Sequence, residues 1–161
     1  MTGTGQPKAT IVIVDDEQIV VTSIRAFLEM DSEFEVLAFT DVREAEKCFE
    51  SRQVDVVVSD YRMPVMNGLQ LLARIKQSQP EATRVLLTSH ADAESAIKAI
   101  NEVSLYQYLE KPWDNEQLLL VVRSAAERSR ILRELSGKIH ELDLAHHRLK
   151  DVQKRLIHAF L

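Results

Sequence analysis

Five polar residues of this chain stand at the ends of short apolar segments, and their side chains could do chemistry together. They are Asp15, Asp16, Asp60, Thr88 and Lys111. Three carboxylates held close together repel one another, so such a cluster needs a cation, and hard oxygen ligands suit Mg²⁺ or Mn²⁺. A metal there could bring in a phosphoryl group, whose oxygens the Lys111 ammonium and the Thr88 hydroxyl could hold. No Ser-His or Cys-His pair stands at these positions, so the nucleophile left is a carboxylate, and Asp60 is the best placed.

The apolar segments that carry these residues are typical of strands buried on both faces of a sheet. The predicted strands are residues 10–14, 34–38, 54–59, 84–87 and 105–109. Apolar residues at helical spacing predict helices between them, at about 19–30, 42–52, 69–79 and 93–101. Asp41 and Glu44 have the spacing of a capping box at the start of the second helix. Alternating strands and helices predict an α/β fold with a parallel sheet, in which ligands bind outside the carboxyl ends of the strands.

Composition and charge favour an intracellular domain with an appended helix. Residues 1–122 contain 11 Lys and Arg against 20 Asp and Glu, whereas residues 123–161 contain 9 against 5. The acidic part argues against direct binding of nucleic acid, and a basic tail is typical of a solvated helix face. No apolar run is long enough to span a bilayer, and the N-terminus lacks the apolar centre of a secretory signal, so we expect a cytoplasmic protein. Cys48 is the only cysteine, which excludes an internal disulfide or a cysteine-rich zinc site.

The pattern changes from Asp114 onward, because no proline and only Gly137 interrupt the remaining residues. A heptad frame with mostly apolar residues at its two core positions runs unbroken from Leu118 to Phe160. One core position holds Leu118, Ala125, Leu132, Ile139, His146, Gln153 and Phe160, and the other holds Val121, Arg128, Leu135, Leu142, Leu149 and Leu156. The predicted organisation is a disordered tail over residues 1–8, a domain over 9–123 and a coiled-coil stalk over 124–161 that continues the last helix and forms a homodimer.

Residues 9–123 resemble the receiver domain of two-component response regulators. The resemblance rests on VDDE after the first strand, SDYRMPVMNG around Asp60, a Thr-Ser pair after the fourth strand and Lys-Pro after the fifth. It implies a flavodoxin-like, doubly wound sheet of five parallel strands in the order 2-1-3-4-5. It also implies that Asp60 accepts a phosphoryl group from a partner histidine kinase. The only catalysis implied is self-phosphorylation and slow autodephosphorylation.

The resemblance also implies a set of metal ligands. Asp16, Asp60 and the backbone carbonyl of Arg62 would bind Mg²⁺, with Asp15 helping directly or through water. Arg62 and His90, two residues after Asp60 and Thr88 respectively, are expected at the rim of the site, where they could tune the lifetime of the phosphoryl group.

A switch is implied as well. Thr88 and Lys111 would contact the phosphoryl group, and Tyr108 would be the switch aromatic whose ring follows the Thr88 hydroxyl. The face made by the fourth helix, fifth strand and fifth helix would then be remodelled for partners. The Lys111–Pro112 bond is expected to be cis.

Other interpretations stay open at this point. One is a metal-dependent phosphatase with an aspartyl nucleophile, although Arg62 stands where a second acid is expected. Another is an adaptor in which the coiled coil is the working part and phosphorylation is incidental. The tail histidines suggest a phosphorelay module, but surface or heptad positions explain them better. The heptad phase at the last residue suggests a chain cut before a downstream effector domain, by analogy a cyclic-di-GMP enzyme, an HD-type hydrolase or an AAA+ module.

Overall fold

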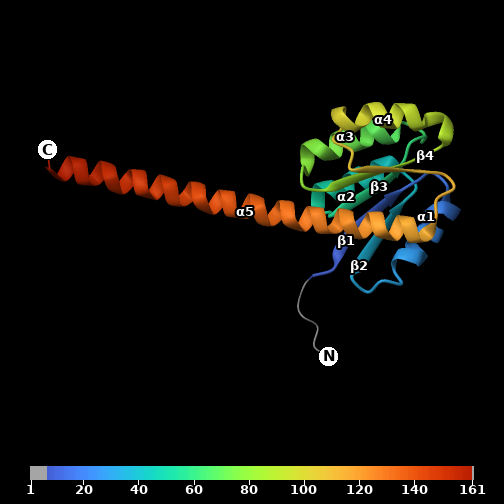
Figure 1. Cartoon of the computed structure of the whole chain (residues 1–161), viewed down its shortest axis with the longest axis horizontal. Coiled ribbons are helices and arrows are strands. Elements are labelled where there is room, and N and C mark those ends of the chain that lie inside the picture. The colour runs from blue at the N-terminus through green and yellow to red at the C-terminus, as the bar shows by residue number, and fades with distance from the viewer. Residues whose placement is uncertain (1–6, 161) are drawn as a thin grey trace. The chain divides into compact units, whose positions relative to one another are not determined.

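The computed structural model describes residues 7–160, apart from the side chain of Ala99, and contains a five-stranded parallel sheet (Figure 1). The strands are β1 (Ala9–Val14), β2 (Phe34–Phe39), β3 (Val56–Asp60), β4 (Thr83–Thr88) and β5 (Gln107–Glu110). The helices are α1 (Gln18–Leu28), α2 (Val42–Ser51), α3 (Gly68–Ser78), α4 (Ala93–Glu102) and α5 (Asn115–Phe160), with a short 3₁₀ turn, η1 (His90–Asp92), before α4.

The strand order is β2-β1-β3-β4-β5, so the predicted α/β fold and its 2-1-3-4-5 topology are confirmed. Every described strand pair is parallel, as the βα alternation predicted. The expected loose terminus over residues 1–8 lies, for residues 1–6, outside the described part of the chain.

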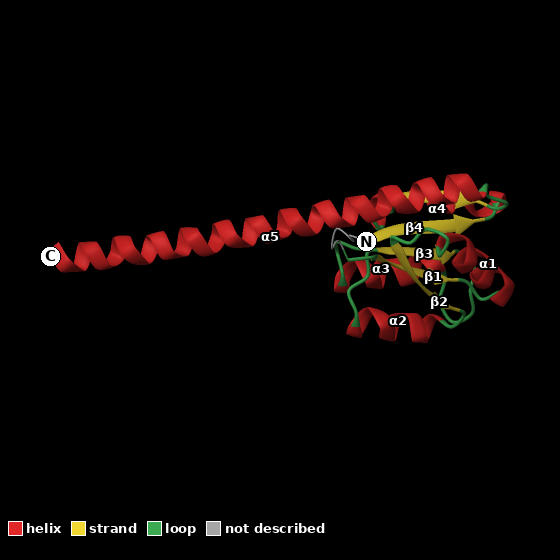
Figure 2. Ribbon diagram, turned by 90° about the horizontal axis from the view of Figure 1, so that it is seen from below, coloured by secondary structure: helices red, strands yellow, loops and turns green. Residues whose placement is uncertain are grey.

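Helices cover both faces of the sheet (Figure 2). Alternate residues of each strand point to opposite sides, and the apolar residues on both sides are buried by helices. On one face, Val12 and Val57 belong to a core built with α2, α3 and α4. On the other, Ile13 and Val58 belong to a core built with α1 and the first turns of α5. Central strands that are apolar on both faces are what an uninterrupted run of β-branched residues predicts.

The strand register brings the polar residues to one edge. Val14 pairs with Ser59, which places Asp15 beside Asp60 at the ends of β1 and β3. Asp60 pairs with Leu87, next to Thr88, and Thr88 pairs with Glu110 at the end of β5. The carboxyl ends of β1, β3, β4 and β5 therefore lie together.

The capping of α2 differs from the sequence-based expectation, and a capping box is found at another helix. The Asp41 carboxylate accepts a hydrogen bond from the backbone N–H of Arg43 at 2.9 Å, so Asp41 does cap α2, but without the expected reciprocal bond from Glu44. The reciprocal capping box is found instead at α3, where Asn67 and Gln70 each accept from the other's backbone N–H at 2.9 Å. Asn67 thus fixes the point at which the loop after Asp60 becomes a helix.

The described chain forms two compact units, one ending at Ser129 and one beginning at Arg130. Within the first unit, α5 buries one face against the sheet through Leu118, Val122, Ala125 and Ser129. Leu118 and Ala125 are two of the predicted heptad core residues, so the beginning of the heptad frame packs on this domain. The Ser129 hydroxyl is bonded to the backbone N–H of Thr83 at 3.1 Å, to the Thr83 hydroxyl at 2.7 Å and to the Asp55 carbonyl.

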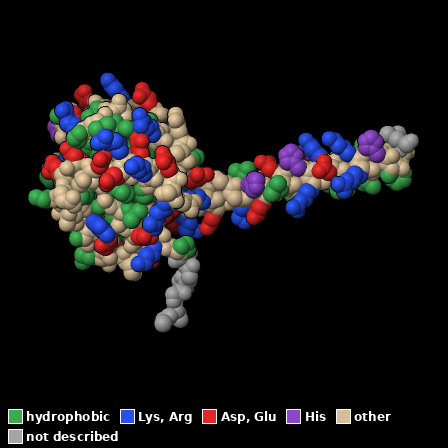
Figure 3. All heavy atoms as spheres, turned by 180° about the vertical axis from the view of Figure 1, so that it is seen from behind, with side chains coloured by type: hydrophobic (Ala, Val, Ile, Leu, Met, Phe, Trp, Pro, Cys, Tyr) green, Lys and Arg blue, Asp and Glu red, His purple; other side chains and the backbone are tan. Residues whose placement is uncertain are grey.

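The second unit consists of the rest of α5, and most of its apolar heptad residues are exposed in the single chain, whereas Leu132 is partly buried. Leu135, Ile139, Leu142, Leu149 and Leu156 each expose about half or more of their surface. Apolar, charged and histidine side chains are interspersed along this segment (Figure 3). Between residues 7 and 160, no helix combines the length and the apolar character needed to cross a membrane.

Candidate functional site

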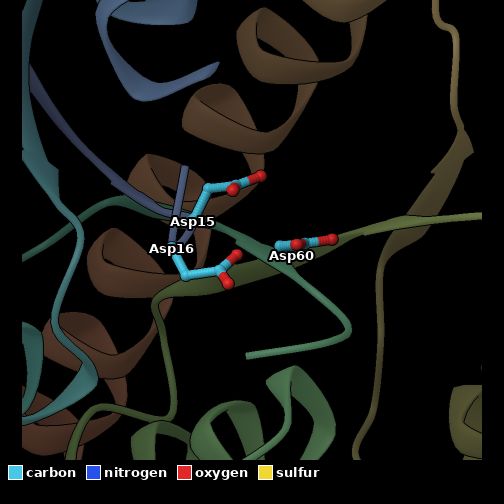
Figure 4. Close-up of side chains that lie close together, drawn as sticks. All are labelled: Asp15, Asp16 and Asp60. Atoms are coloured by element: carbon cyan, nitrogen blue, oxygen red, sulfur yellow. The ribbon is translucent and has the colours of Figure 1, made fainter. Parts of the chain in front are cut away.

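Three carboxylates meet at the ends of β1 and β3 (Figure 4). Asp15, Asp16 and Asp60 each place one oxygen so that the three oxygens lie within 4.8 Å of one another. Asp15 is fully buried and Asp60 nearly so, whereas Asp16 is exposed. The cluster is therefore anchored in the protein on one side and open to solvent on the other.

Lys111 brings a positive charge into this cluster from the end of β5. Its Nζ lies 2.9 Å from Oδ1 of Asp60 and 3.5 Å from Oδ2 of Asp15. Its backbone N–H donates to the Thr88 carbonyl at 2.8 Å, so the strand ladder fixes where the side chain begins. The Lys111–Pro112 peptide is cis, as predicted.

The electrostatics of the site follow from burial and charge. The pKa of Asp15 is raised to about 6, chiefly by burial and also by the neighbouring Asp60 charge, although the backbone N–H of Glu17 and the Lys111 ammonium both act to lower it. Burial alone would lower the pKa of Lys111, but its hydrogen bond to Asp60 and the charge of Asp15 outweigh burial and raise it. The site thus holds more negative charge than one ammonium balances.

A divalent cation fits this arrangement. Mg²⁺ prefers carboxylate and carbonyl oxygens, and the three clustered acids are a donor set of that kind. Asp15, Asp16 and Asp60 would hold the ion. The further ligand expected at the Arg62 backbone carbonyl stays a prediction.

Thr88 ends β4, and Tyr108 lies on the neighbouring strand β5, two residues before its end. Thr88 is fully buried, and its hydroxyl donates to the Ser89 carbonyl at 3.2 Å. Tyr108 is half-buried on β5, paired in register with Leu86, and packs against the core on the α2–α3–α4 side of the sheet. A move of the Thr88 hydroxyl toward Asp60 would have to break its bond to Ser89.

Two side-chain contacts involve the β4–α4 loop, an ion pair between Arg62 and Asp92 and a contact between His90 and Glu110. The Arg62 guanidinium makes a two-pronged contact with the Asp92 carboxylate, Nε to Oδ2 at 2.8 Å and Nη2 to Oδ1 at 3.0 Å. The Ser89 hydroxyl donates to the same Asp92 Oδ2 at 3.1 Å. On the other side, Nδ1 of His90 lies 3.3 Å from Oε2 of Glu110.

The structure thus gives the two predicted rim residues specific partners. The role of Asp92 was missed by sequence reasoning, since a single acid in a loop gives no signal of its partner. The Arg62 side chain is 78% exposed and Asp92 only 11%. Arg62, and then Ser89, hold the pKa of Asp92 below its usual value by hydrogen bonding to the charged form.

The loop that follows Asp60 contains one close approach and one unusual turn. A Cβ on Gly68 would lie 2.1 Å from the backbone oxygen of Asp60, so only glycine lets α3 begin this close to the strand end. Val65 has a φ of 77° at the centre of a tight turn closed by a 2.9 Å hydrogen bond from Met66 N–H to the Pro64 carbonyl.

A family model and the similar proteins of known sequence point to the same protein family. Residues 11–123 match the model of the response regulator receiver domain. The chain is 35% identical over 137 residues to the hydrogenase transcriptional regulatory protein HoxA of Cupriavidus necator, covering 85% of this chain and 27% of HoxA. It is 35% identical over 121 residues to the DNA-binding transcriptional regulator NtrC of Proteus hauseri, covering 73% of this chain and 24% of NtrC.

Among solved structures, the chain is similar to the signal receiver domain of an HD domain-containing protein from Pseudomonas fluorescens Pf-5. The TM-score is 0.76 at 37% identity, with 83% of this chain and 97% of that one covered. The chain spans about a quarter of the length of the two curated relatives. With this match to the family model and this fold, the chain belongs to the response regulator receiver family.

Proposed function

We propose that this chain is a phosphorylation-dependent switch in which Asp60 accepts a phosphoryl group from a partner histidine kinase in a Mg²⁺-dependent reaction. The observation that carries the proposal is the Asp60 carboxylate at the end of β3, 2.9 Å from the Lys111 ammonium and beside Asp15 and Asp16. A nucleophile, a fixed cation and a metal-binding acid cluster are the parts that phosphoryl transfer needs.

The reaction is a substitution at phosphorus. A carboxylate oxygen of Asp60 attacks the phosphoryl group of a phosphohistidine, so an O–P bond forms as the donor's P–N bond breaks. Lys111 and the backbone N–H groups after Asp60 stabilise the negative charge on the oxygens of the transferred phosphoryl group. Bound Mg²⁺ supplies further positive charge for those oxygens. The protein acts on its own Asp60 and on no separate substrate, and loss of the phosphoryl group to water resets it.

The phosphorylated state is read through Thr88 and Tyr108. The new dianion on Asp60 attracts the Thr88 hydroxyl, which then leaves the Ser89 carbonyl that it contacts at 3.2 Å. The Tyr108 ring, half-buried on β5, moves into the vacated space. The face made by α4, β5 and the first turns of α5 changes as a result, and partners bind that face.

The output passes through a dimeric stalk to an effector. The exposed heptad residues after Ser129 support pairing of two copies, because an apolar stripe of this length is rarely left in water. The names of the relatives, two transcriptional regulators and an HD domain-containing protein, support an effector beyond the receiver. The location that we propose is cytoplasmic.

The first test is labelling of Asp60. With acetyl phosphate or a phosphorylated histidine kinase in the presence of Mg²⁺, we expect the intact mass to increase by one phosphoryl group. The Asp60→Asn variant and a sample with EDTA are expected to show no gain. Labelling that persists in Asp60→Asn would contradict the assignment of the acceptor.

The second test concerns the stalk. Light scattering with and without beryllofluoride, a phosphoryl mimic, measures whether the dimer responds to the state of Asp60. Leu142→Asn is expected to weaken the dimer, whereas Glu141→Gln, a polar neighbour on the same helix, is the matched control. A dimer that is unaffected by beryllofluoride would favour an adaptor role over a switch.

A further inference from the structure

The β3–α3 and β4–α4 loops are joined by a small polar cluster, which we call the loop bridge and which consists of Arg62, Ser89 and Asp92. The Asp92 carboxylate accepts two hydrogen bonds from Arg62 and one from the Ser89 hydroxyl. Its backbone N–H also donates to the Ser89 carbonyl at 3.1 Å. The bridge therefore spans from the loop after Asp60 to the loop after Thr88.

Ser89 connects this bridge to the residue that must move in the proposed switch. The Ser89 carbonyl is the acceptor of the Thr88 hydroxyl. The same carbonyl accepts from the Asp92 N–H, and the Ser89 side chain is bonded to the Asp92 carboxylate. As long as Arg62 holds Asp92, the two contacts of Asp92 fix both the carbonyl and the hydroxyl of Ser89. The Ser89 carbonyl then stays in the orientation in which it accepts from the Thr88 hydroxyl.

We propose that Asp92 is a positioning residue, which with Arg62 fixes Ser89 and thereby favours the unphosphorylated position of the Thr88 hydroxyl. The inference rests on the proposed function, since it assigns to Asp92 an effect on the switch at Asp60. The described hydrogen bonds of the Asp92 carboxylate go to Arg62 and Ser89, and its proposed effect on the switch passes through Ser89. Breaking the bridge frees Ser89 and makes the activated arrangement easier to reach.

The size of the effect follows from the exposure of the two partners. Arg62 is 78% exposed and solvent screens it, but Asp92 is 11% exposed and the contact is two-pronged. A pair of this kind belongs to the upper part of the range for surface ion pairs, which corresponds to about a three- to fivefold change in an equilibrium constant. High salt should reduce the effect, because the guanidinium is in water.

The experiment measures the affinity of the chain for beryllofluoride in the presence of Mg²⁺, from the intensity of the bound ¹⁹F resonance. Asp92→Asn and Arg62→Gln should each bind about three- to fivefold more tightly than the unmodified protein. The double variant should bind no more tightly than either single variant, because both changes remove the same contact. Arg62→Gln changes an exposed side chain and so keeps the test valid if Asp92→Asn lowers stability.

A matched control is the ion pair between Arg74 and Glu46, which joins α3 to α2 with Nη1 and Oε1 2.8 Å apart. Arg74→Gln removes a similarly exposed pair and should leave the beryllofluoride affinity unchanged. A bridge that merely stabilises the fold would lower the melting temperature of the variants without changing that affinity. Affinities of Asp92→Asn and Arg62→Gln within about 1.5-fold of the unmodified protein would overturn the inference.

The same data separate this inference from the proposed function. Failure of the unmodified protein to bind beryllofluoride in a way that Asp60→Asn abolishes would overturn the proposed function. Binding that depends on Asp60 but is indifferent to the loop bridge would overturn only the role of Asp92.

Discussion

Asp15 is a buried acid whose removal should stabilise the metal-free protein. It is fully buried at the end of β1, close to Asp60 and Asp16. Among residues 7–160, the groups that favour its charge are the Lys111 ammonium at 3.5 Å and the Glu17 N–H at 2.9 Å. In Asp15→Asn the amide oxygen can still accept from the Glu17 N–H. The substitution therefore removes a desolvated charge while keeping the local hydrogen bond.

The magnitude follows from the pKa. The unfolded chain releases the Asp15 proton near its ordinary pKa of 3.8, and the folded chain holds it to about 6. Between these values the folded state binds more protons, so the free energy of unfolding falls as the pH rises, and the loss is complete by about pH 8. The difference between a pKa of 3.8 and one of about 6 corresponds to about 3 kcal/mol, which is the most that Asp15→Asn can restore at neutral pH.

The assay is denaturant unfolding in EDTA, followed by the fluorescence of Trp113, the single tryptophan. The difference between Asp15→Asn and the unmodified protein should grow from near zero at about pH 4 to its full value at about pH 8. Asp16→Asn, which removes an equal charge from an exposed position of the same cluster, is the control and should show a much smaller gain. A variant that is less stable than the unmodified protein at pH 8, or a difference that does not depend on pH, would refute the reasoning.

Three further predictions concern the way α5 is held on the first unit. Ser129→Ala removes a buried hydroxyl and leaves the Thr83 N–H without this acceptor, so we expect a loss of about 1–3 kcal/mol in unfolding free energy by denaturant titration. Leu118→Ala should lower the unfolding free energy by about 2–5 kcal/mol in the same assay because Leu118 is fully buried. Leu120→Ala, at an exposed position of the same helix, should change it by no more than about 0.5 kcal/mol. Arg123→Gln breaks the 2.9 Å ion pair with Asp31 and should cost less than about 1 kcal/mol. The pKa of Asp31 is lowered, first by the Glu33 N–H and then by Arg123, so this cost should disappear as the pH falls and Asp31 is protonated, and a cost that persists in acid would contradict the ion-pair explanation.

The fold and the position of the candidate site could be predicted from the sequence because both depend on local patterns. Runs of β-branched residues predict buried strands, and a parallel sheet necessarily gathers the strand ends at which Asp15, Asp60 and Lys111 stand. The pairing of Arg62 with Asp92 could not be predicted, since it depends on the conformations of two loops 30 positions apart. Such contacts have no period and no fixed spacing.

The heptad frame shows a second limit. A helix that packs on a sheet and a helix that pairs with another copy can both present an apolar stripe with nearly the same spacing. The frame therefore ran through Leu118 and Ala125 without a sign that these residues are buried on this domain. Only tertiary structure separates the part of the stripe that is already covered from the part after Ser129 that is not.

Glycine is required at position 68, at the end of the loop after Asp60, because a side chain has no space there and not because of its backbone conformation. Any residue other than glycine at position 68 would place a Cβ 2.1 Å from the Asp60 carbonyl oxygen, so every amino-acid replacement there, alanine included, should be rejected. Position 65 is the reverse case, because Val65 is 73% exposed yet has a left-handed backbone that β-branched residues disfavour. In a library of random variants, selection for folding should therefore keep position 68 invariant and enrich glycine and asparagine at position 65, three residues away in the same loop.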